Sequence, residues 1–144
     1  MALASASLAH AQEGVCHGPP SNTRLMVTVD GVKNDKGQVA VVLYGDDQKK
    51  FLKQELMDTY DPAHAGSTTV CISLPHPGQY ALVAYHDANS NKDLDTGLLG
   101  VPKEGYGFSN NVRPVLSAPS FNATHIVAAA GDNRLSVRLH YPGH

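Results

Sequence analysis

The fold class is decided by a seven-residue run near the middle of the chain, Thr68-Thr69-Val70-Cys71-Ile72-Ser73-Leu74. Its large apolar residues, at 70, 72 and 74, alternate with Thr69, Cys71 and Ser73, which is the period of a strand buried on one face. The next four residues, Pro-His-Pro-Gly, are typical of a turn. The segment is therefore predicted to be a β-strand that ends in a tight turn.

Similar β-rich segments recur on both sides of this run. They cover about residues 25–30, 38–44, 56–60, 79–85, 123–129 and 134–141. The first two are separated by turn residues at 31–37 and are predicted to form a hairpin. Residues 46–54 break the pattern, and Asp47 is placed to cap a short helix there. About seven short strands with one short helical insert and one long loop predict an all-β, Greek-key sandwich.

The length of 144 residues and the formal net charge of −2 fit one globular domain. The sequence has no basic stripe and no polybasic block, so neither a nucleic acid nor an anionic membrane surface is an expected partner. No stretch reaches the roughly 20 apolar residues of a membrane-spanning helix. We divide the chain into residues 1–22, a signal-peptide remnant with an N-terminal arm, and residues 23–144, the sandwich domain.

The first twelve residues are rich in alanine and serine. Within them, Ala9-His10-Ala11 matches the small-residue pattern that precedes a signal-peptidase cut. A basic n-region is missing, so the true start of the leader is expected further upstream, and a frayed tail is the alternative interpretation. Signal-peptide character predicts a periplasmic or secreted protein.

The two cysteines, Cys16 and Cys71, show no spacing typical of a zinc site. In an oxidising compartment two cysteines usually pair, so a Cys16–Cys71 disulfide is predicted, with two separate reduced thiols as the alternative. If the large apolar residues of the run 68–74 face the core, Cys71 projects from the other face of its strand. An N-terminal arm that carries Cys16 would then cross that face.

The long loop, residues 86 to about 120, opens with oxygen-bearing side chains at every second position. Calcium prefers six to eight oxygen ligands, and an EF-hand-like loop supplies them from positions 1, 3, 5, 7 and 9. These positions are filled by Asp87, Asn89, Asn91, Asp93 (through its carbonyl) and Asp95. Carboxylates this close repel one another without a cation, so the loop is predicted to bind calcium.

Two residues depart from the calcium-loop pattern. Lys92 stands where glycine usually eases the turn, and Leu98 stands where an EF-hand supplies a bidentate glutamate. Glu104 is a candidate for the missing ligand. The alternative interpretation is an Asx-rich turn, held by hydrogen bonds from side chains to the backbone.

The second half of the long loop combines glycines with aromatic and amide side chains. We predict an exposed ligand or partner patch on this loop, formed by Glu104, Tyr106, Phe108, Ser109, Asn110, Asn111 and Arg113. Its partner would be a protein, a glycan or a small ligand. The alternative is an Ω-loop that its aromatic rings pin onto the end of the sandwich.

Several stretches of this chain resemble one bacterial family, "domain of unknown function 2141". They are Asp30-Gly-Val-Lys-Asn-Asp-Lys-Gly-Gln-Val-Ala40, Phe51-Leu52, Gly78-Gln-Tyr-Ala-Leu-Val-Ala-Tyr-His-Asp-Ala-Asn89 and Leu99-Gly-Val-Pro-Lys-Glu-Gly-Tyr-Gly-Phe-Ser-Asn-Asn111. The similarity covers about residues 24–141. It implies an exported bacterial protein with a transthyretin- or immunoglobulin-like sandwich and no assigned activity. Family members commonly carry Asp-x-Asn-Gly-Asn-Gly in the acidic loop, whereas Ser90 and Lys92 replace both glycines here.

No arrangement typical of catalysis is found in the sequence. His86 next to Asp87 could orient a general base, but there is no nucleophile elbow and no zinc-type histidine motif. Transthyretin-like hydroxyisourate hydrolases end in Tyr-Arg-Gly-Ser, whereas this chain ends in Leu-His-Tyr-Pro-Gly-His. We therefore expect a calcium-stabilised binding or structural module without enzymatic activity.

A carrier of a small apolar ligand is the main alternative, and such a hydrolase is the second. The module predicts a filled core, whereas the carrier predicts an apolar cavity of roughly 300–1,000 Å³.

Overall fold

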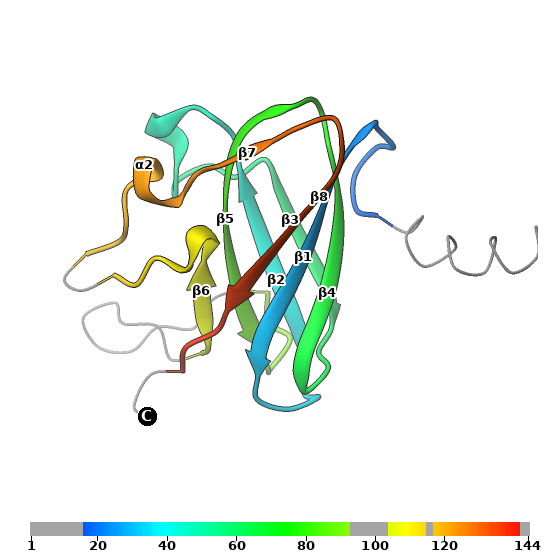
Figure 1. Ribbon diagram of the computed structural model, residues 1–144. Helices are drawn as coiled ribbons and strands as arrows, with labels where there is room; N and C mark the ends of the chain where they lie inside the picture. The colour runs from blue at the N-terminus through cyan, green and yellow to red at the C-terminus, as the bar shows by residue number, and fades with distance from the viewer. Residues whose placement is uncertain (1–15, 93–103, 115–116, 142–144) are drawn as a thin grey trace, which may run out of the picture.

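Two β-sheets face each other in the computed structural model, which describes residues 16–92, 104–114 and 117–141 (Figure 1). One sheet has the strand order β4–β1–β8, and the other has the order β3–β2–β5–β6, with β7 also paired to β5. The strands are β1 (Thr23–Val32), β2 (Gln38–Tyr44), β3 (Met57–Pro62), β4 (Gly66–Leu74), β5 (Gly78–Asp87), β6 (Tyr106–Phe108), β7 (Ile126–Ala128) and β8 (Gly131–Arg138). The predicted all-β class is confirmed.

The predicted hairpin between β1 and β2 is wrong. Strand β1 pairs with β4 and, in parallel, with β8, whereas β2 pairs with β3 and β5. The connection between β1 and β2 therefore crosses from one sheet to the other. Each of the two strands has one apolar face, and placing these faces against each other across the interior removes both from water.

The core lies between the sheets and is filled by alternate residues of the long strands. Ten of these side chains are at most 1% exposed: Leu25, Val27, Val29, Val39, Val41, Leu43, Val70, Ile72, Leu74 and Leu82. Burying one such side chain contributes about 1.5–3 kcal/mol. Among the described residues, every buried side-chain nitrogen or oxygen has a hydrogen-bond partner.

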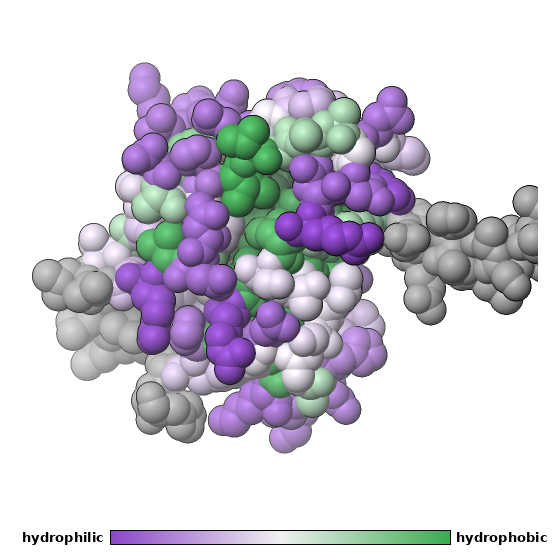
Figure 2. All heavy atoms as spheres, viewed as in Figure 1, coloured by the Kyte–Doolittle hydropathy of each residue, from purple (hydrophilic) through white to green (hydrophobic). Residues whose placement is uncertain are grey.

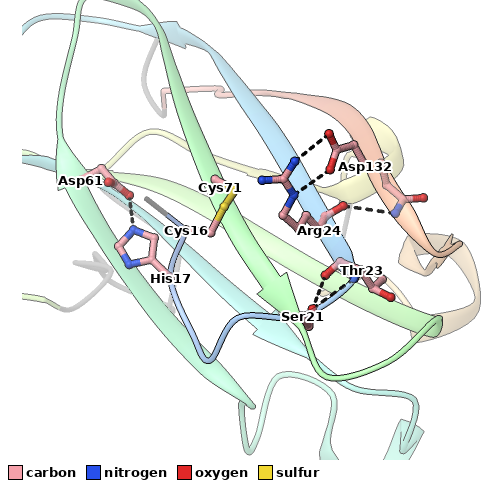
Figure 3. The surroundings of a disulfide bond; sticks show 9 residues. Cys16, His17, Ser21, Thr23, Arg24, Asp61, Cys71 and Asp132 are labelled. Atoms are coloured by element: carbon pink, nitrogen blue, oxygen red, sulfur yellow. Dashed lines mark hydrogen bonds and ion pairs between the residues drawn. A yellow bond between two sulfur atoms is a disulfide. The ribbon is translucent and has the colours of Figure 1, made fainter. Parts of the chain in front are cut away.

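The predicted disulfide between Cys16 and Cys71 is present, and it holds the N-terminal arm against the free edge of β4 (Figure 3). The His17 backbone N–H donates to Cys71 O at 2.9 Å, and the Ser73 N–H donates to His17 O at 2.8 Å. The His17 side chain reaches β3, where its Nε2 lies 2.8 Å from a carboxylate oxygen of Asp61. The arm thus covers an edge that would otherwise be open to another strand.

The described parts of the chain also contain three short helical turns: η1 (Gln48–Lys50), η3 (Ser109–Asn111) and α2 (Phe121–Thr124). The predicted cap of the first is confirmed, because Asp47 Oδ1 accepts the Lys49 N–H at 3.0 Å. The segment expected to be one long loop contains β6 and η3, and α2 begins just after it. Among the described residues, no helix is long and apolar enough to cross a membrane.

Candidate functional site

The acidic loop starts at Asp87, the last residue of β5, which is 0% exposed. Its Oδ1 accepts the Asn91 N–H at 3.1 Å. Its Oδ2 accepts the Lys92 N–H at 2.8 Å and the Gln38 Nε2–H at 3.0 Å. A carboxylate offers about four acceptor positions, so these bonds use most of what Asp87 has. The described half of the loop therefore has the hydrogen bonds of an Asx-rich turn.

The turn that follows Asp87 has left-handed backbone at two residues. Ser90 has φ 55° and Lys92 has φ 63°, and these are the two positions at which the resembled family carries glycine. A side chain with a Cβ is disfavoured in this conformation, so the Asp87 bonds hold the turn against that preference. Asn89 and Asn91 are exposed beside it. Asp93 and Asp95 lie outside the described residues, and within those residues no three His, Cys, Asp or Glu side chains converge to hold a metal.

The predicted ligand patch stays a prediction, but its central polar residues bond to the backbone of the sandwich. Ser109 is 0% exposed, and its Oγ accepts the Leu82 N–H at 3.1 Å and donates to Thr124 O at 2.6 Å. Asn110 and Asn111 are themselves exposed, but their amides are engaged. Asn110 Nδ2 donates to Ala123 O and His125 O, and Asn111 Oδ1 accepts the Arg138 N–H at 2.9 Å.

The expected exposure of the aromatic rings is wrong for Phe108, which is 7% exposed, whereas Tyr106 is half-buried. The glycines between them serve close packing. A Cβ on Gly107 would clash with the carbonyl oxygen of Arg138, and one on Gly105 would clash with the ring of Tyr141. The Ω-loop alternative therefore describes this segment better. Of the two remaining residues of the predicted patch, Glu104 is half-buried and Arg113 is exposed.

His86, the residue that could serve as a general base, is 2% exposed and has both ring nitrogens occupied. Its Nε2 lies 2.7 Å from Lys36 O, which can only accept, so Nε2 carries the hydrogen. The Lys33 N–H donates to the Tyr141 hydroxyl at 2.8 Å, and that hydroxyl lies 2.9 Å from His86 Nδ1. In the neutral imidazole Nδ1 is then the acceptor and the hydroxyl the donor, and His86 joins the β1–β2 connection to the C-terminal segment.

A hollow of about 290 Å³ lies on the outer face of the β3–β2–β5–β6 sheet, and we call it the tyrosine groove. Strand register builds it, since Asp58, Val42, Val83 and Phe108 lie in one row across the four strands. In the next row, the small residue Ala40 separates two tyrosines. The groove is lined by Val42, Tyr44, Leu52, Glu55, Asp58, Tyr60, Val83, Tyr85, Lys92 and Phe108.

Negative charge dominates the rim of the tyrosine groove. Burial, the charge of Glu55 and a hydrogen bond with Glu55 raise the pKa of Asp58 above its usual value. Burial and the charges of Glu55 and Asp58 raise the pKa of Tyr44 to about 12. Burial and a hydrogen bond with Tyr60 raise the pKa of Tyr85. The Lys92 ammonium lies 5.3 Å from the centre of the Tyr60 ring, so the groove holds a cation of its own.

A second hollow, of about 500 Å³, lies at the end of the sandwich where the chain leaves β1 and β8, and we call it the basic hollow. It is lined by Gly31, Lys33, Arg113, Arg138, Leu139, His140 and Tyr141. Hydrophilic side chains gather on this part of the surface, over β6 and the C-terminal end of β8 (Figure 2). Burial and the charges of Arg113 and Arg138 lower the pKa of His140.

Sequence reasoning found Arg113 but missed the other polar residues of the basic hollow. Lys33 stands among ordinary turn residues. Arg138 and His140 lie on the predicted strand 134–141, where they alternate with apolar residues and are typical of a solvent-exposed strand face. The sequence signal that exists is the parallel placement of the last strand beside the first. That pairing can be argued only once the sheet order is known.

Comparison with known proteins finds no curated protein and no solved structure that matches this chain. One family model matches, described as "Uncharacterized protein conserved in bacteria (DUF2141)", and the match covers residues 27–136. Among the described residues, the matched range includes β2 to β7 in full, parts of β1 and β8, the start of the acidic turn, η3, the whole lining of the tyrosine groove, and Gly31, Lys33 and Arg113 of the basic hollow. The chain therefore belongs to the bacterial DUF2141 family, as the sequence motifs predicted.

Proposed function

We propose that this protein is an exported, non-catalytic binding module that meets its ligand in the basic hollow. The observation that carries the proposal is unbalanced charge on a fixed frame. Lys33, Arg113 and Arg138 surround one hollow, and none of these side chains forms an ion pair among the described residues. Charged side chains held together in this way favour recognition of a partner of opposite charge.

The engagement of His86 supports a binding role over a hydrolytic one. A general base must reach a substrate proton with a free ring nitrogen, and both nitrogens of His86 are bonded within the protein. The imidazole is also 2% exposed. The hydrogen bonds of His86 and of the adjacent Asp87 give both residues a structural role, because they join the end of β5 to the β1–β2 connection and to β2.

The filled core supports the module over a carrier of a small apolar ligand. The side chains between the sheets are tightly buried, and the tyrosine groove and the basic hollow both open at the surface and carry charged residues. A carrier would need an enclosed apolar cavity of roughly 300–1,000 Å³. The hydrolase alternative gains no support from the residues around His86.

Export is supported by the disulfide. Cys16 and Cys71 are paired, and disulfides persist in oxidising compartments such as the periplasm or the cell exterior. Because the disulfide closes a sequence separation of 55 residues, it is expected to add about 4 kcal/mol in the chain-entropy model.

Calcium binding by the acidic loop is a further part of the proposal. Asp87 keeps about one acceptor position after its three hydrogen bonds, and the exposed Asn89 and Asn91 stand beside it. The His86 N–H donates to Gly105 O at 2.8 Å, which brings the backbone next to Glu104 close to this turn. An ion there would stabilise the turn rather than take part in chemistry.

Native mass spectrometry of the full chain, recovered from the extracytoplasmic fraction of a bacterial host, tests the function. We expect the mass of the processed chain less two hydrogens, with no apolar molecule bound. A Cys16→Ser, Cys71→Ser double variant is the control for the disulfide mass. A stoichiometric lipid that leaves on denaturation would contradict the module and favour the carrier, and accelerated loss of hydroxyisourate would favour the hydrolase.

A further inference from the structure

We propose that the ligand of the basic hollow is a doubly charged tetrahedral oxyanion, in biology the phosphate group of a monoester or free phosphate. This assignment rests on the proposed binding function and names the chemistry of its ligand. The hollow, of about 500 Å³, is large enough for a phosphate together with part of the molecule that carries it.

The first argument is the sign of the charge. Lys33, Arg113 and Arg138 are exposed cations at the rim, and no aspartate or glutamate is among the lining residues that the structure describes. This local charge contrasts with the whole chain, whose formal net charge is −2. An anion is therefore attracted to this hollow, although the chain as a whole carries a net negative charge.

Acidic residues in the vicinity are committed to other partners. Asp30 is the register neighbour of Arg138 on β1, but its Oδ1 accepts the hydroxyl of Ser67 at 2.7 Å. Asp35, in the turn after β1, accepts the Ala65 N–H at 2.7 Å. Both carboxylates keep their negative charge, but neither lines the hollow and, among the described residues, neither forms an ion pair with Arg113 or Arg138.

The second argument is that the hollow is built before any ligand arrives. The Tyr141 ring forms part of its lining, and the hydroxyl is fixed by the Lys33 N–H and by His86. The Lys33 ammonium lies 5.7 Å from the centre of that ring. Since less freedom is lost on binding when the frame is already ordered, this arrangement favours affinity.

The main chain beneath the two arginines is also fixed. Asn111 accepts the Arg138 N–H, and His140 exchanges two backbone hydrogen bonds with Tyr106, at 2.9 and 3.1 Å. Asn110 and Asn111 have left-handed backbone, with φ 64° and 54°, and turn the chain two residues before Arg113, which lines the hollow. The two guanidinium groups therefore come from different segments that are tied to each other.

The third argument selects the class of anion. A carboxylate would leave most of the positive charge in the hollow uncompensated, whereas a phosphate monoester carries about −1.5 to −2 at neutral pH. The planar guanidinium group matches two phosphate oxygens at once, and the lysine ammonium adds a point charge. Two arginines and one lysine around a single hollow therefore fit a phosphate better than a carboxylate.

Isothermal titration calorimetry of the full chain with inorganic phosphate, at pH 7.5 and constant ionic strength, tests the assignment. We expect saturable binding that an equal concentration of acetate does not reproduce. The double variant Arg113→Ala, Arg138→Ala should bind at least tenfold more weakly, because it removes both guanidinium groups. Its melting temperature should stay that of the parent, since both side chains are exposed and make no described ion pair.

Arg134→Ala is the control matched to Arg138→Ala, because each removes one guanidinium group from β8 and only Arg138 lines the hollow. Its affinity for phosphate should stay within about twofold of the parent, which corresponds to roughly 0.4 kcal/mol. Equal losses in Arg134→Ala and in the double variant would show a general charge effect and overturn the proposal. Equal binding of acetate and phosphate would do the same.

NMR titration of His140 gives a second readout. Its pKa is held low by burial and by Arg113 and Arg138, and the other titratable groups that line the hollow with it are Lys33 and Tyr141. A bound dianion offsets the two guanidinium charges, so saturating phosphate should raise the pKa of His140 in the parent chain. An unchanged pKa despite calorimetric binding would place the anion elsewhere and contradict the assignment.

Two further probes separate the possible sources of the phosphate. Glycerol phosphate in solution tests a small ester, and vesicles of phosphatidic acid, with phosphatidylcholine as the control, test a lipid headgroup. Binding of either one that is lost in the double variant supports the proposal and identifies the source. No binding of phosphate, ester or vesicles overturns the ligand class alone, whereas a lipid held inside the sandwich would overturn the proposed function itself.

Discussion

The basic hollow and the tyrosine groove lie on different parts of the same sandwich and differ in how their charge is balanced. In the groove, the negative charge of Glu55 acts on Asp58 and helps to raise its pKa, and the Lys92 ammonium lies over the Tyr60 ring. In the hollow, the charges of Arg113 and Arg138 both act on His140, and the described part of the lining contains no carboxylate. The groove therefore holds charged groups of both signs, whereas the described lining of the hollow holds cations only.

Because of this difference, we expect the basic hollow rather than the tyrosine groove to bind a ligand. The tyrosine groove holds the more conspicuous residues, but its floor is continuous with the buried part of the molecule: Phe108 is 7% exposed and Tyr85 is 4% exposed. The cations of the basic hollow are exposed on fixed backbone. We therefore expect substitutions in the groove floor to change stability and substitutions at the hollow rim to change binding.

The largest expected effect comes from Phe108→Ala in the groove floor. The ring packs against its neighbours on the sheet and is 7% exposed, and truncating a buried phenylalanine costs about 3–5 kcal/mol. Urea denaturation of the variant and the parent measures the difference. Arg113→Ala is the matched rim variant and should change the free energy of unfolding by less than about 0.5 kcal/mol. Similar losses in both would remove the distinction between floor and rim.

Tyr141→Phe tests the frame of the basic hollow and should have the next largest effect. The change keeps the ring but removes the hydroxyl that accepts from Lys33 N–H and donates to His86 Nδ1. Because His86 is 2% exposed, its ring nitrogen loses a partner that water replaces poorly, at a cost of about 1–3 kcal/mol. The expected loss appears as a lower urea midpoint at an unchanged slope. A stability equal to that of the parent would show that the hydroxyl is not needed to hold the connection.

Addition of calcium tests the acidic turn. Asp87 anchors this turn, and Lys92 extends from it to the tyrosine groove. At 5–10 mM calcium and a dissociation constant near 10⁻³ M, we expect a gain of about 1 kcal/mol and a few degrees in melting temperature. Thermal melts in EDTA, calcium and magnesium measure it. Asp95→Asn is a cleaner variant than Asp87→Ala, since Asp87 also bonds to Gln38 and the turn. Identical melts in all three solutions would leave the Asx-rich turn as the full account.

Local sequence patterns predicted the strand periods, the Asp47 cap and the disulfide because each depends on residues near one another or on chemistry with few options. The pairing of the strands was not predictable in the same way. Strand β1 has the same two-residue period whether it pairs with β2 or with β4, and only the burial of both apolar faces decides between them. The basic hollow depends on that pairing, so the sequence did not predict that its residues lie together.

The roles of polar side chains in loops were also not predictable from the sequence. Ser109, Asn110 and Asn111 offer donors and acceptors whether they face solvent or a backbone group, and the sequence does not distinguish the two. In the structure all three bond to neighbouring segments, because backbone groups left open beside an irregular loop need partners. Arg113 has no such backbone role, and it is the residue of the predicted patch that remains exposed and charged.

The smallest expected effect is a pH dependence at the rim of the tyrosine groove. Asp58 has a pKa raised by burial and by Glu55, so the folded state holds its proton more tightly than the unfolded state. Stability therefore falls as pH rises from the ordinary pKa of about 3.9 through the higher folded value, and it stays lower above that range. Asp58→Asn removes this dependence and should make the chain slightly more stable at pH 7, by less than about 0.5 kcal/mol because the side chain is exposed. Glu55→Gln should have a similar effect by removing the neighbouring charge, and urea midpoints between pH 4 and pH 7 measure both. If both variants kept the slope of the parent, the pH dependence would come from groups other than Asp58 and Glu55, and the raised pKa of Asp58 would be contradicted.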